Sequence, residues 1–231
     1  MAGLPVDTLR FLAQLKKHNN RSWFEANRHR YERIRNEALA FTTALLQRIR
    51  QFDPSVAHTP AEACLFRIYR DLRFTKDKSP FKTHIGIAIS AHGKNFAGAG
   101  YYLHLEPGNC FAAGGCWMPD SRQLYLIRQE IDYNYPAFLK IIQAPAFRRY
   151  FQGLDEDLKL TRPPRGYAAD HPAIEWLKLK SFTCSTPIPQ HVIATPQLLS
   201  RLERIFKAMN PFIQFLNTAL SDAESDKISF F

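Results

Sequence analysis

The sequence predicts an α+β fold in which helices flank a central, largely antiparallel sheet, all within a single domain over residues 1–231. Near both ends of the chain, apolar residues recur at three- and four-residue steps, as in helices that bury one face. Between residues 65 and 117 the apolar runs are short and end at turn residues, as strands do. A chain of 231 residues that is 45% hydrophobic can also bury one full core.

Two helices are predicted at the start of the chain. Asp7 is placed to cap a short helix that ends in the polar run 18–20. Ser22 and Glu25 have the spacing of a capping box, so a longer helix is expected over residues 22–50. Four arginines lie mostly off its apolar stripe and are expected to face solvent: Arg28, Arg30, Arg33 and Arg35.

The middle of the chain is predicted to form strands at residues 65–69, 84–91, 101–105 and 111–117. The last two strands are joined by Glu106-Pro107-Gly108-Asn109, which has Pro and Gly at the central positions of a type II turn. These two strands are therefore expected to form a hairpin.

The second half of the chain is predicted to return to helices. Asp120 and Gln123 repeat the capping-box spacing, and Asp170 is placed to cap a further helix. Pro196 opens a C-terminal helix that Pro211 should kink or restart. The remaining predicted elements are a helix at 136–143 and a strand at 182–188.

The charge of the chain is uneven. Its formal net charge is +10, and residues 1–150 carry 22 Lys and Arg against 12 Asp and Glu, whereas residues 151–231 carry 9 of each. A basic field attracts phosphates at long range, so this asymmetry favours a polyanionic partner. The alternative is that a basic surface only keeps the protein soluble, and the charge alone leaves both interpretations open.

The composition also bears on location and metal binding. The chain has no apolar run long enough to span a membrane and no secretory signal at its start, so we expect a cytoplasmic protein without a membrane partner. Its cysteines form no Cys-x-x-Cys pair, which favours reduced thiols in or near the core and no metal site. They are Cys64, Cys110, Cys116 and Cys184.

The most unusual stretch is residues 66–84, which hold six Lys or Arg and two Asp. Arginine forks and lysine charges at the end of a strand bind phosphate or carboxylate groups, with the aspartates orienting the cations. If the preceding strand alternates, Arg67 and Tyr69 share one face and Ile68 lies on the other. The alternative is an internal Arg–Asp network that pins a long connection. The candidate ligand-binding residues here are Arg67, Arg70, Asp71, Arg73, Lys78 and Lys82.

Three further groups are candidates for chemistry. His104 and Glu106 share a strand face with Tyr102, and together with His84 they are weak candidates for proton transfer. Glycines weaken strands, so Gly114-Gly115 before Trp117 suggests a bulge or a close approach of ligand or backbone. This spacing fits no phosphate-binding or dinucleotide motif, and the sequence identifies no cofactor. The additional candidate ligand-binding residues are Gly114, Gly115, Trp117 and His171.

Two long stretches, Arg67 to His84 and Gly100 to Pro107, resemble the DUF2461 family, whose name marks a domain of unknown function. The resemblance spans nearly the whole chain and implies a single bacterial-type domain, but it supplies no catalytic residues. Further agreement lies at Trp23-Phe24 with Asn27 and Tyr31, at Gly114-Gly115 before Trp117, at Leu124 to Arg128, and from Lys159-Leu160 through Asp170-His171-Pro172 to Lys180.

Three functional hypotheses follow from the sequence. The first is a domain, or an enzyme, that binds a small anionic or phosphorylated ligand through the basic segment at 67–84. The second is a nucleic-acid-binding module that uses the basic N-terminal two thirds of the chain. The third is an accessory protein that binds a protein partner, for which an exposed apolar patch would be the signature. The sequence specifies no oligomeric state.

Overall fold

The computed structural model describes residues 3–73 and 75–228, with side chains described up to residue 221. Its strands form a four-stranded sheet in the order β1-β2-β3-β4. The pair β1-β2 is antiparallel and places Gly86 opposite His104. The strands are β1 (Ile85–Ile89), β2 (Gly100–Leu105), β3 (Phe111–Cys116) and β4 (Phe182–Pro187). This is the α+β architecture with an antiparallel sheet that the sequence predicts.

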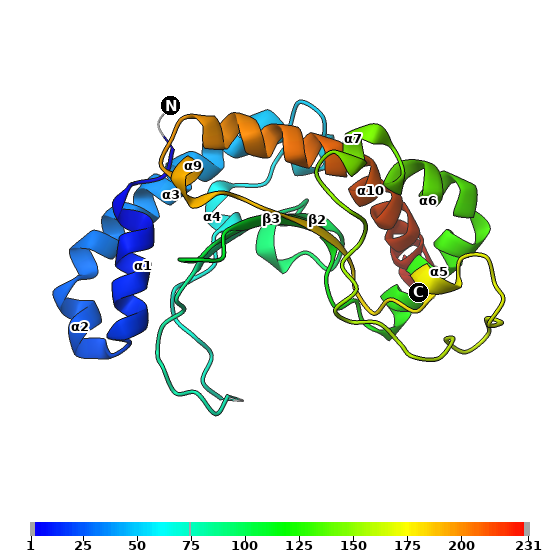
Figure 1. Ribbon diagram of the computed structural model, residues 1–231, viewed down its shortest axis with the longest axis horizontal. Helices are drawn as coiled ribbons and strands as arrows, with labels where there is room; N and C mark the ends of the chain where they lie inside the picture. Colours follow the sequence, from blue (N-terminus) through cyan, green and yellow to red (C-terminus); the bar gives the residue numbers. More distant parts are fainter. Residues whose placement is uncertain (1–2, 74, 229–231) are drawn as a thin grey trace. The chain divides into compact units, whose positions relative to one another are not determined.

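Helices occupy most of the remaining described chain, and Figure 1 shows how they follow one another. The α-helices are α1 (Asp7–Lys17), α2 (Arg21–Ala26), α3 (Arg28–Ile49), α4 (Ala61–Cys64), α5 (Ser121–Tyr133), α6 (Tyr135–Ile142), α7 (Pro145–Arg148), α8 (Ile174–Leu177), α9 (Gln190–Ile193) and α10 (Gln197–Ile228). Two short 3-10 helices lie at η1 (Pro54–Val56) and η2 (Gly93–Asn95).

The described residues gather into two compact units. The first draws on residues 1–95, 101–112 and 187–205, and the second on residues 96–100, 113–186 and 206–231. Each unit has its own fully buried aromatic side chains, which supply much of its core. Phe11, Phe24 and Tyr101 belong to the first unit, and Phe138, Phe147, Phe151, Phe182, Phe206 and Phe212 belong to the second.

Two predicted helix caps at the start of the chain are wrong: Asp7 pairs with a distant arginine, and Asn20 takes the capping position expected for Ser22. Asp7 lies inside α1 and makes no cap; its carboxylate accepts hydrogen bonds from Arg30 at 3.1 and 2.9 Å. The side chain that caps α2 is Asn20, which accepts a bond from the amide of Trp23 at 2.9 Å. Ser22 is a residue of α2, and the single long helix predicted over 22–50 divides into α2 and α3 at Asn27.

Of three further local signals, two are confirmed and one is wrong. The capping box of Asp120 and Gln123 is confirmed, with both reciprocal bonds present. The turn before β3 is also confirmed, since Gly108 has a φ of +86° and the amide of Asn109 donates to the carbonyl of Glu106 at 2.9 Å. The predicted cap at Asp170 is wrong, because α8 begins four residues later.

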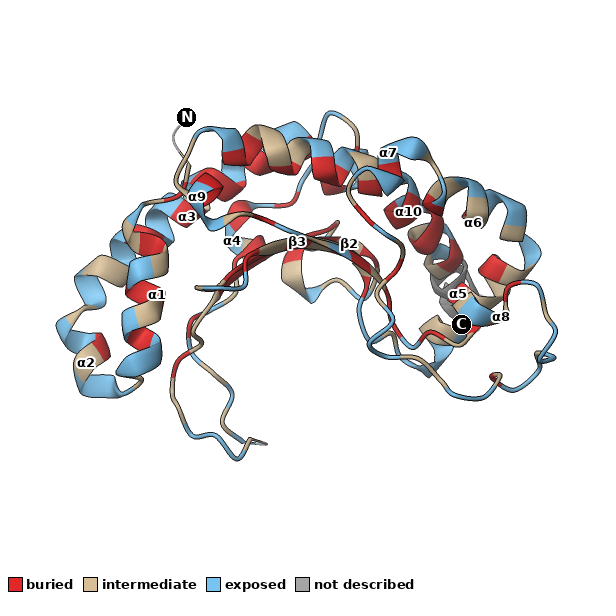
Figure 2. Ribbon diagram, viewed as in Figure 1, coloured by how far each residue is buried: buried red, intermediate tan, exposed pale blue. Residues whose placement is uncertain are grey.

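The two faces of β2 differ in chemistry. Tyr101, Leu103 and Leu105 alternate along the strand and are buried in the core of the first unit. Tyr102 and His104 point to the opposite face, where Glu106 follows directly after the strand. Figure 2 shows how strongly the strands are buried compared with the basic segment. The period of two therefore presents polar side chains on one face of a well-packed strand.

Residues 65–69 form no regular strand, although the sequence predicts one. They make only isolated antiparallel bridges, Leu65 with Ile87 and Tyr69 with Phe81. The two bridges are four residues apart on the segment 65–69 but six residues apart on the facing segment 81–87. The facing segment therefore holds two extra residues, which form a bulge that interrupts the pairing. The predicted alternation still holds, because Arg67 and Tyr69 are exposed and Ile68 is buried.

Candidate functional site

The basic segment is an ordered, two-armed ribbon. Its arms are joined by the amide of Arg70, which donates to Pro80 at 3.0 Å, and by the amide of Lys82, which donates to Ile68 at 2.7 Å. Phe81 anchors the ribbon, since its ring stacks on Phe24 of α2 at a centroid distance of 4.0 Å. Figure 1 shows the ribbon extending from the strands as a long loop. Cationic side chains on such a scaffold are held in place, unlike those of a flexible tail.

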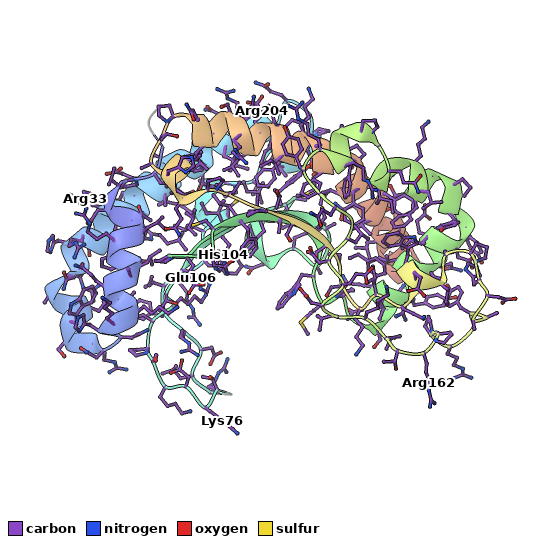
Figure 3. The ribbon with its side chains drawn as sticks, in the orientation of Figure 1. Arg33, Lys76, His104, Glu106, Arg162 and Arg204 are labelled. Atoms are coloured by element: carbon purple, nitrogen blue, oxygen red, sulfur yellow. The ribbon has the colours of Figure 1, made fainter. Side chains whose placement is uncertain are left out.

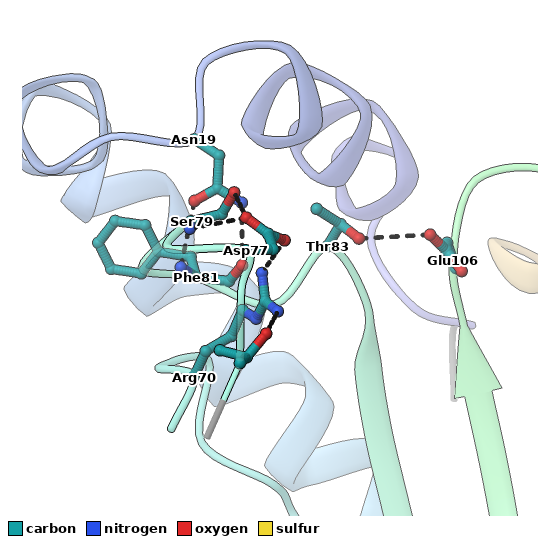
Figure 4. Close-up of polar contacts among 8 residues, drawn as sticks. Asn19, Arg70, Asp77, Ser79, Phe81, Thr83 and Glu106 are labelled. Atoms are coloured by element: carbon teal, nitrogen blue, oxygen red, sulfur yellow. Dashed lines mark hydrogen bonds and ion pairs between the residues drawn. The ribbon is translucent and has the colours of Figure 1, made fainter. Parts of the chain in front are cut away.

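The tip of the segment, defined by the described residues 70–73 and 75–79, is a network of internal polar contacts. Arg70 forms an ion pair with Asp77, which also accepts bonds from the amide and hydroxyl of Ser79 at 2.9 and 2.6 Å (Figure 4). Arg73 pairs with Asp71 at 2.6 Å. The bonds from Ser79 and then Arg70 hold the pKa of Asp77 well below its usual range, and Arg73 does the same to the pKa of Asp71.

Lys78 is also engaged within the tip, because its ammonium group donates to the carbonyl of Leu72 at 3.0 Å. Each of these cations therefore has a partner inside the segment. This is the internal Arg–Asp network that the sequence left open as an alternative to ligand binding.

The base of the segment, defined here as Arg67, Lys82, Thr83 and His84, is arranged differently. Among the side chains that the structure describes, Arg67 and Lys82 have no carboxylate within ion-pair distance. The ammonium group of Lys82 lies 5.1 Å from the centre of the Phe66 ring. Burial lowers the pKa of Lys82, and the charge of Arg67 lowers it further. Arg67 and Lys82 thus influence each other without an ion pair to a carboxylate, although the charge of Arg67 also helps to lower the pKa of Asp71 at the tip.

The bulge brings two consecutive side chains to the polar face of β2. In a regular strand, Thr83 and His84 would point to opposite faces. Here the hydroxyl of Thr83 donates to Glu106 at 3.3 Å, while the ring of His84 stacks on His104 at a centroid distance of 4.5 Å. His104 in turn stacks on Phe111 of β3 at 4.7 Å. A bulge that re-aims side chains in this way is a common device beside functional sites.

A chain of polar contacts runs along the face of β2, where Figure 3 marks His104 and Glu106. The hydroxyl of Tyr102 lies 3.0 Å from Nδ1 of His104, and Nε2 of His104 lies 3.5 Å from a carboxylate oxygen of Glu106. Lys16 of α1 lies 3.5 Å from the other carboxylate oxygen. An ionised Glu106 only accepts hydrogen bonds, so Nε2 carries the proton and Tyr102 donates to Nδ1. Both nitrogens of His104 are therefore engaged.

Burial sets the protonation of this cluster. It lowers the pKa of His84 to about 4, and the nearby His104 and Lys82 act in the same direction. It also lowers the pKa of His104 and raises that of Tyr102 to about 12. For Glu106, burial acts to raise the pKa, but His104, Lys16 and Thr83 together bring it below its usual value. At neutral pH both imidazoles are uncharged and Glu106 is ionised.

The structure brings together the proton-transfer candidates His84, His104 and Glu106 next to Lys82, all within the first unit. A hollow lined by His84, Tyr31 and Arg35 adjoins them, but it encloses only about 10 Å³, roughly the space of one water. The sequence analysis missed two members of the cluster, Thr83 and Lys16. No local signal marks Lys16, because its helix lies far from β2 in the sequence.

Gly114, Gly115, Trp117 and His171 belong to the second unit. The close backbone approach expected at the glycines is present: a Cβ on Gly115, whose φ is +126°, would collide with the carbonyl oxygen of Phe182, and one on Gly114 would collide with Met209. The neighbours are protein atoms of β4 and α10, so tight packing accounts for both glycines.

The other two candidates of the second unit differ in their surroundings. Trp117 is 73% exposed. His171 accepts a bond from the amide of Ala173 at 3.1 Å, and its Nε2 lies 2.9 Å from a carboxylate oxygen of Asp132. It therefore supports the start of α8, where Asp170 had been predicted to cap.

The described residues contain no group of three or more His, Cys, Asp or Glu side chains arranged to hold a metal ion. All four cysteines are buried and free, as predicted for reduced thiols. None of the helices in the part of the chain that the structure describes has the length and apolar character needed to cross a membrane.

Comparisons with known proteins give one finding. No curated protein and no solved structure matches the chain. A family model described as "Conserved hypothetical protein (DUF2461)" matches residues 7–215. The match takes in the basic segment, the polar face of β2 and most of both units. Because it covers most of the 231 residues, the chain belongs to the DUF2461 family.

Proposed function

We propose that the protein binds a small anionic or phosphorylated ligand at the base of the basic segment. The observation that carries the proposal is the pair of cations, Arg67 and Lys82, which lie close enough to affect each other and form no ion pair with a carboxylate among the described side chains. Two like charges in such a position are relieved by an anion between them. A guanidinium fork and an ammonium group together suit a phosphate, sulfate or carboxylate.

The ion pairs of other arginines favour a local anion site at the base over a binding surface spread across the protein. Arg28, Arg30 and Arg48 each form an ion pair with a carboxylate, as do Arg70 and Arg73 at the tip. A nucleic-acid-binding surface relies on a continuous stripe of cations that are available to phosphates. Ion pairing within the protein reduces that availability, so the nucleic-acid hypothesis becomes an alternative outcome of the test.

The test is a titration of the protein with sodium sulfate at constant ionic strength, followed by backbone ¹H–¹⁵N NMR. We expect saturable shifts at the base, and about tenfold weaker binding in Arg67→Ala and in Lys82→Ala, because each variant removes one charge-assisted contact. Lys76→Ala, an exposed cation near the far end of the segment (Figure 3), is the matched control and should bind like the unchanged protein.

Two results would count against the proposal. Sulfate affinity that is the same in all four proteins would show that the base is not the anion site. A parallel titration with a short single-stranded DNA addresses the alternative: tight binding that is lost at high salt, without any sulfate binding at the base, would favour a nucleic-acid partner.

A further inference from the structure

We infer that anion binding at the base is coupled to the uptake of one proton by His84, so that the site selects a dianion, such as a phosphate monoester or the free sulfate ion. The inference rests on the function proposed above. Protonated His84 would be a third positive charge beside Arg67 and Lys82, and it would exist only while the ligand is bound. The two histidines of the cluster therefore have different roles, although they are stacked in direct contact.

The first step of the argument is the hydrogen bonding of the two rings. Both nitrogens of His104 are engaged, one with Tyr102 and one with Glu106, and the residue is 9% exposed. In contrast, neither nitrogen of His84 has a hydrogen-bond partner within the described part of the chain, and the residue is partly exposed. His84 can therefore contact a ligand, whereas His104 serves as the platform that fixes the position of the His84 ring.

The second step is the charge around His84. Lys82 lies on its own arm, and His104 and Glu106 face it from β2 and the residue that follows. On the α3 side, Tyr31 and Arg35 line the same hollow as His84. Lys16 of α1 lies beside Glu106. Positive groups outnumber the single carboxylate, and burial also favours the neutral imidazole, so the free site holds His84 uncharged.

The third step is the effect of the ligand. A dianion within hydrogen-bond distance of His84 reverses the sign of the local field and favours the imidazolium. The pKa of His84 then rises on binding, and by linkage the ligand binds more tightly as the pH falls. A neutral ligand or a monoanion would drive this uptake less, because the attraction scales with the charge that it brings.

Sulfate is the suitable probe, because it stays a dianion over the whole range from about pH 8 to about pH 5.5, whereas phosphate titrates there. Binding is measured by NMR, and the ¹⁵N shifts of the imidazoles report which ring takes up a proton. We expect sulfate to bind about tenfold more tightly at the acidic end of this range, with protonation of His84 and not of His104 in the bound state.

Two variants sharpen the measurement. His84→Asn keeps a polar side chain but cannot take up a proton, so its sulfate affinity should no longer depend on pH in this range. His29→Asn, at an exposed position of α3, is the matched control and should retain the full dependence. A pH dependence that persists in His84→Asn would overturn the inference, because the proton would then be taken up elsewhere.

The outcomes also separate this inference from the function on which it rests. Sulfate that binds at the base with equal affinity at every pH would overturn the proton coupling and leave the anion site standing. Sulfate that binds nowhere, or that binds equally well to Arg67→Ala and Lys82→Ala, would overturn both.

Discussion

The tip and the base of the basic segment contain the same kinds of side chains, yet their cations are in opposite situations. At the tip, Arg70 and Arg73 are neutralised by Asp77 and Asp71. At the base, Arg67 and Lys82 lie in each other's field and form no ion pair with a carboxylate in the described chain. A dense run of Lys and Arg is therefore not by itself a binding site. Which cations remain available to a ligand depends on which of them form ion pairs with the neighbouring aspartates.

The largest effect is expected from reversing one charge at each end of the segment. Lys82→Glu should weaken sulfate binding roughly a hundredfold, because it removes an attraction and adds a repulsion. Lys78→Glu, the same change at the tip, should alter the affinity by less than about threefold, since Lys78 bonds to a carbonyl within the tip. Circular dichroism would confirm that both variants fold. Equal losses in the two variants would remove the distinction between tip and base.

A smaller effect is expected on stability in acid, because His84 at the base and the aspartates at the tip change protonation in different pH ranges. The pKa of His84 falls from 6.5 in the unfolded chain to about 4 in the folded protein, so the unfolded state binds more protons between these values. Stability should therefore be lost as the pH falls from about 6.5 to about 4. The loss for this residue between pH 7 and pH 5 should be about 1 kcal/mol, less than the full shift implies, because His84 is only partly buried and solvent screens its charge.

Urea unfolding at several pH values measures this loss, and His84→Asn should reduce it. The aspartates of the tip have lowered pKa values, so their contribution is lost only when the pH falls below their unfolded value of 3.8. An unchanged pH dependence in His84→Asn would contradict the assignment of a neutral His84.

The smallest effect is expected from Arg70→Ala. Asp77 would keep its two bonds from Ser79, and exposed ion pairs contribute little, so the melting temperature should change by about 2 °C or less. Sulfate affinity should stay within about twofold of the original. If this variant instead abolished anion binding while remaining folded, the tip would have to be included in the site.

The sequence was sufficient to predict features that depend on local spacing. The capping box at Asp120 was predicted correctly, because both of its members lie within four residues. The placing of His104 and Glu106 on one face follows from the period of two along β2. The Pro-Gly turn before β3 needs only the permissive backbone of Gly108.

Features that depend on distant partners were not predictable in the same way. Asp7 has the residue type and position of a cap, but Arg30 lies near enough to take its carboxylate. The same limit applies to the site. The pairing of cations and carboxylates within the segment depends on how its arms fold back, and the bulge that turns Thr83 and His84 together has no signature in the pattern of apolar residues.

One contact at the edge of the ribbon satisfies backbone groups that would otherwise be open to pairing with another strand. Phe81 lies opposite Tyr69, and the hydrogen bonds between the two arms are made by the residues on either side of this pair. The amide and carbonyl of Phe81 itself therefore point away from the other arm. The side chain of Asn19 accepts from that amide at 3.1 Å and donates to that carbonyl at 2.9 Å. A single carboxamide thus imitates the hydrogen bonding of an additional strand. The consequence is a blocked edge: open backbone groups of this kind are a general template for intermolecular β-pairing and aggregation.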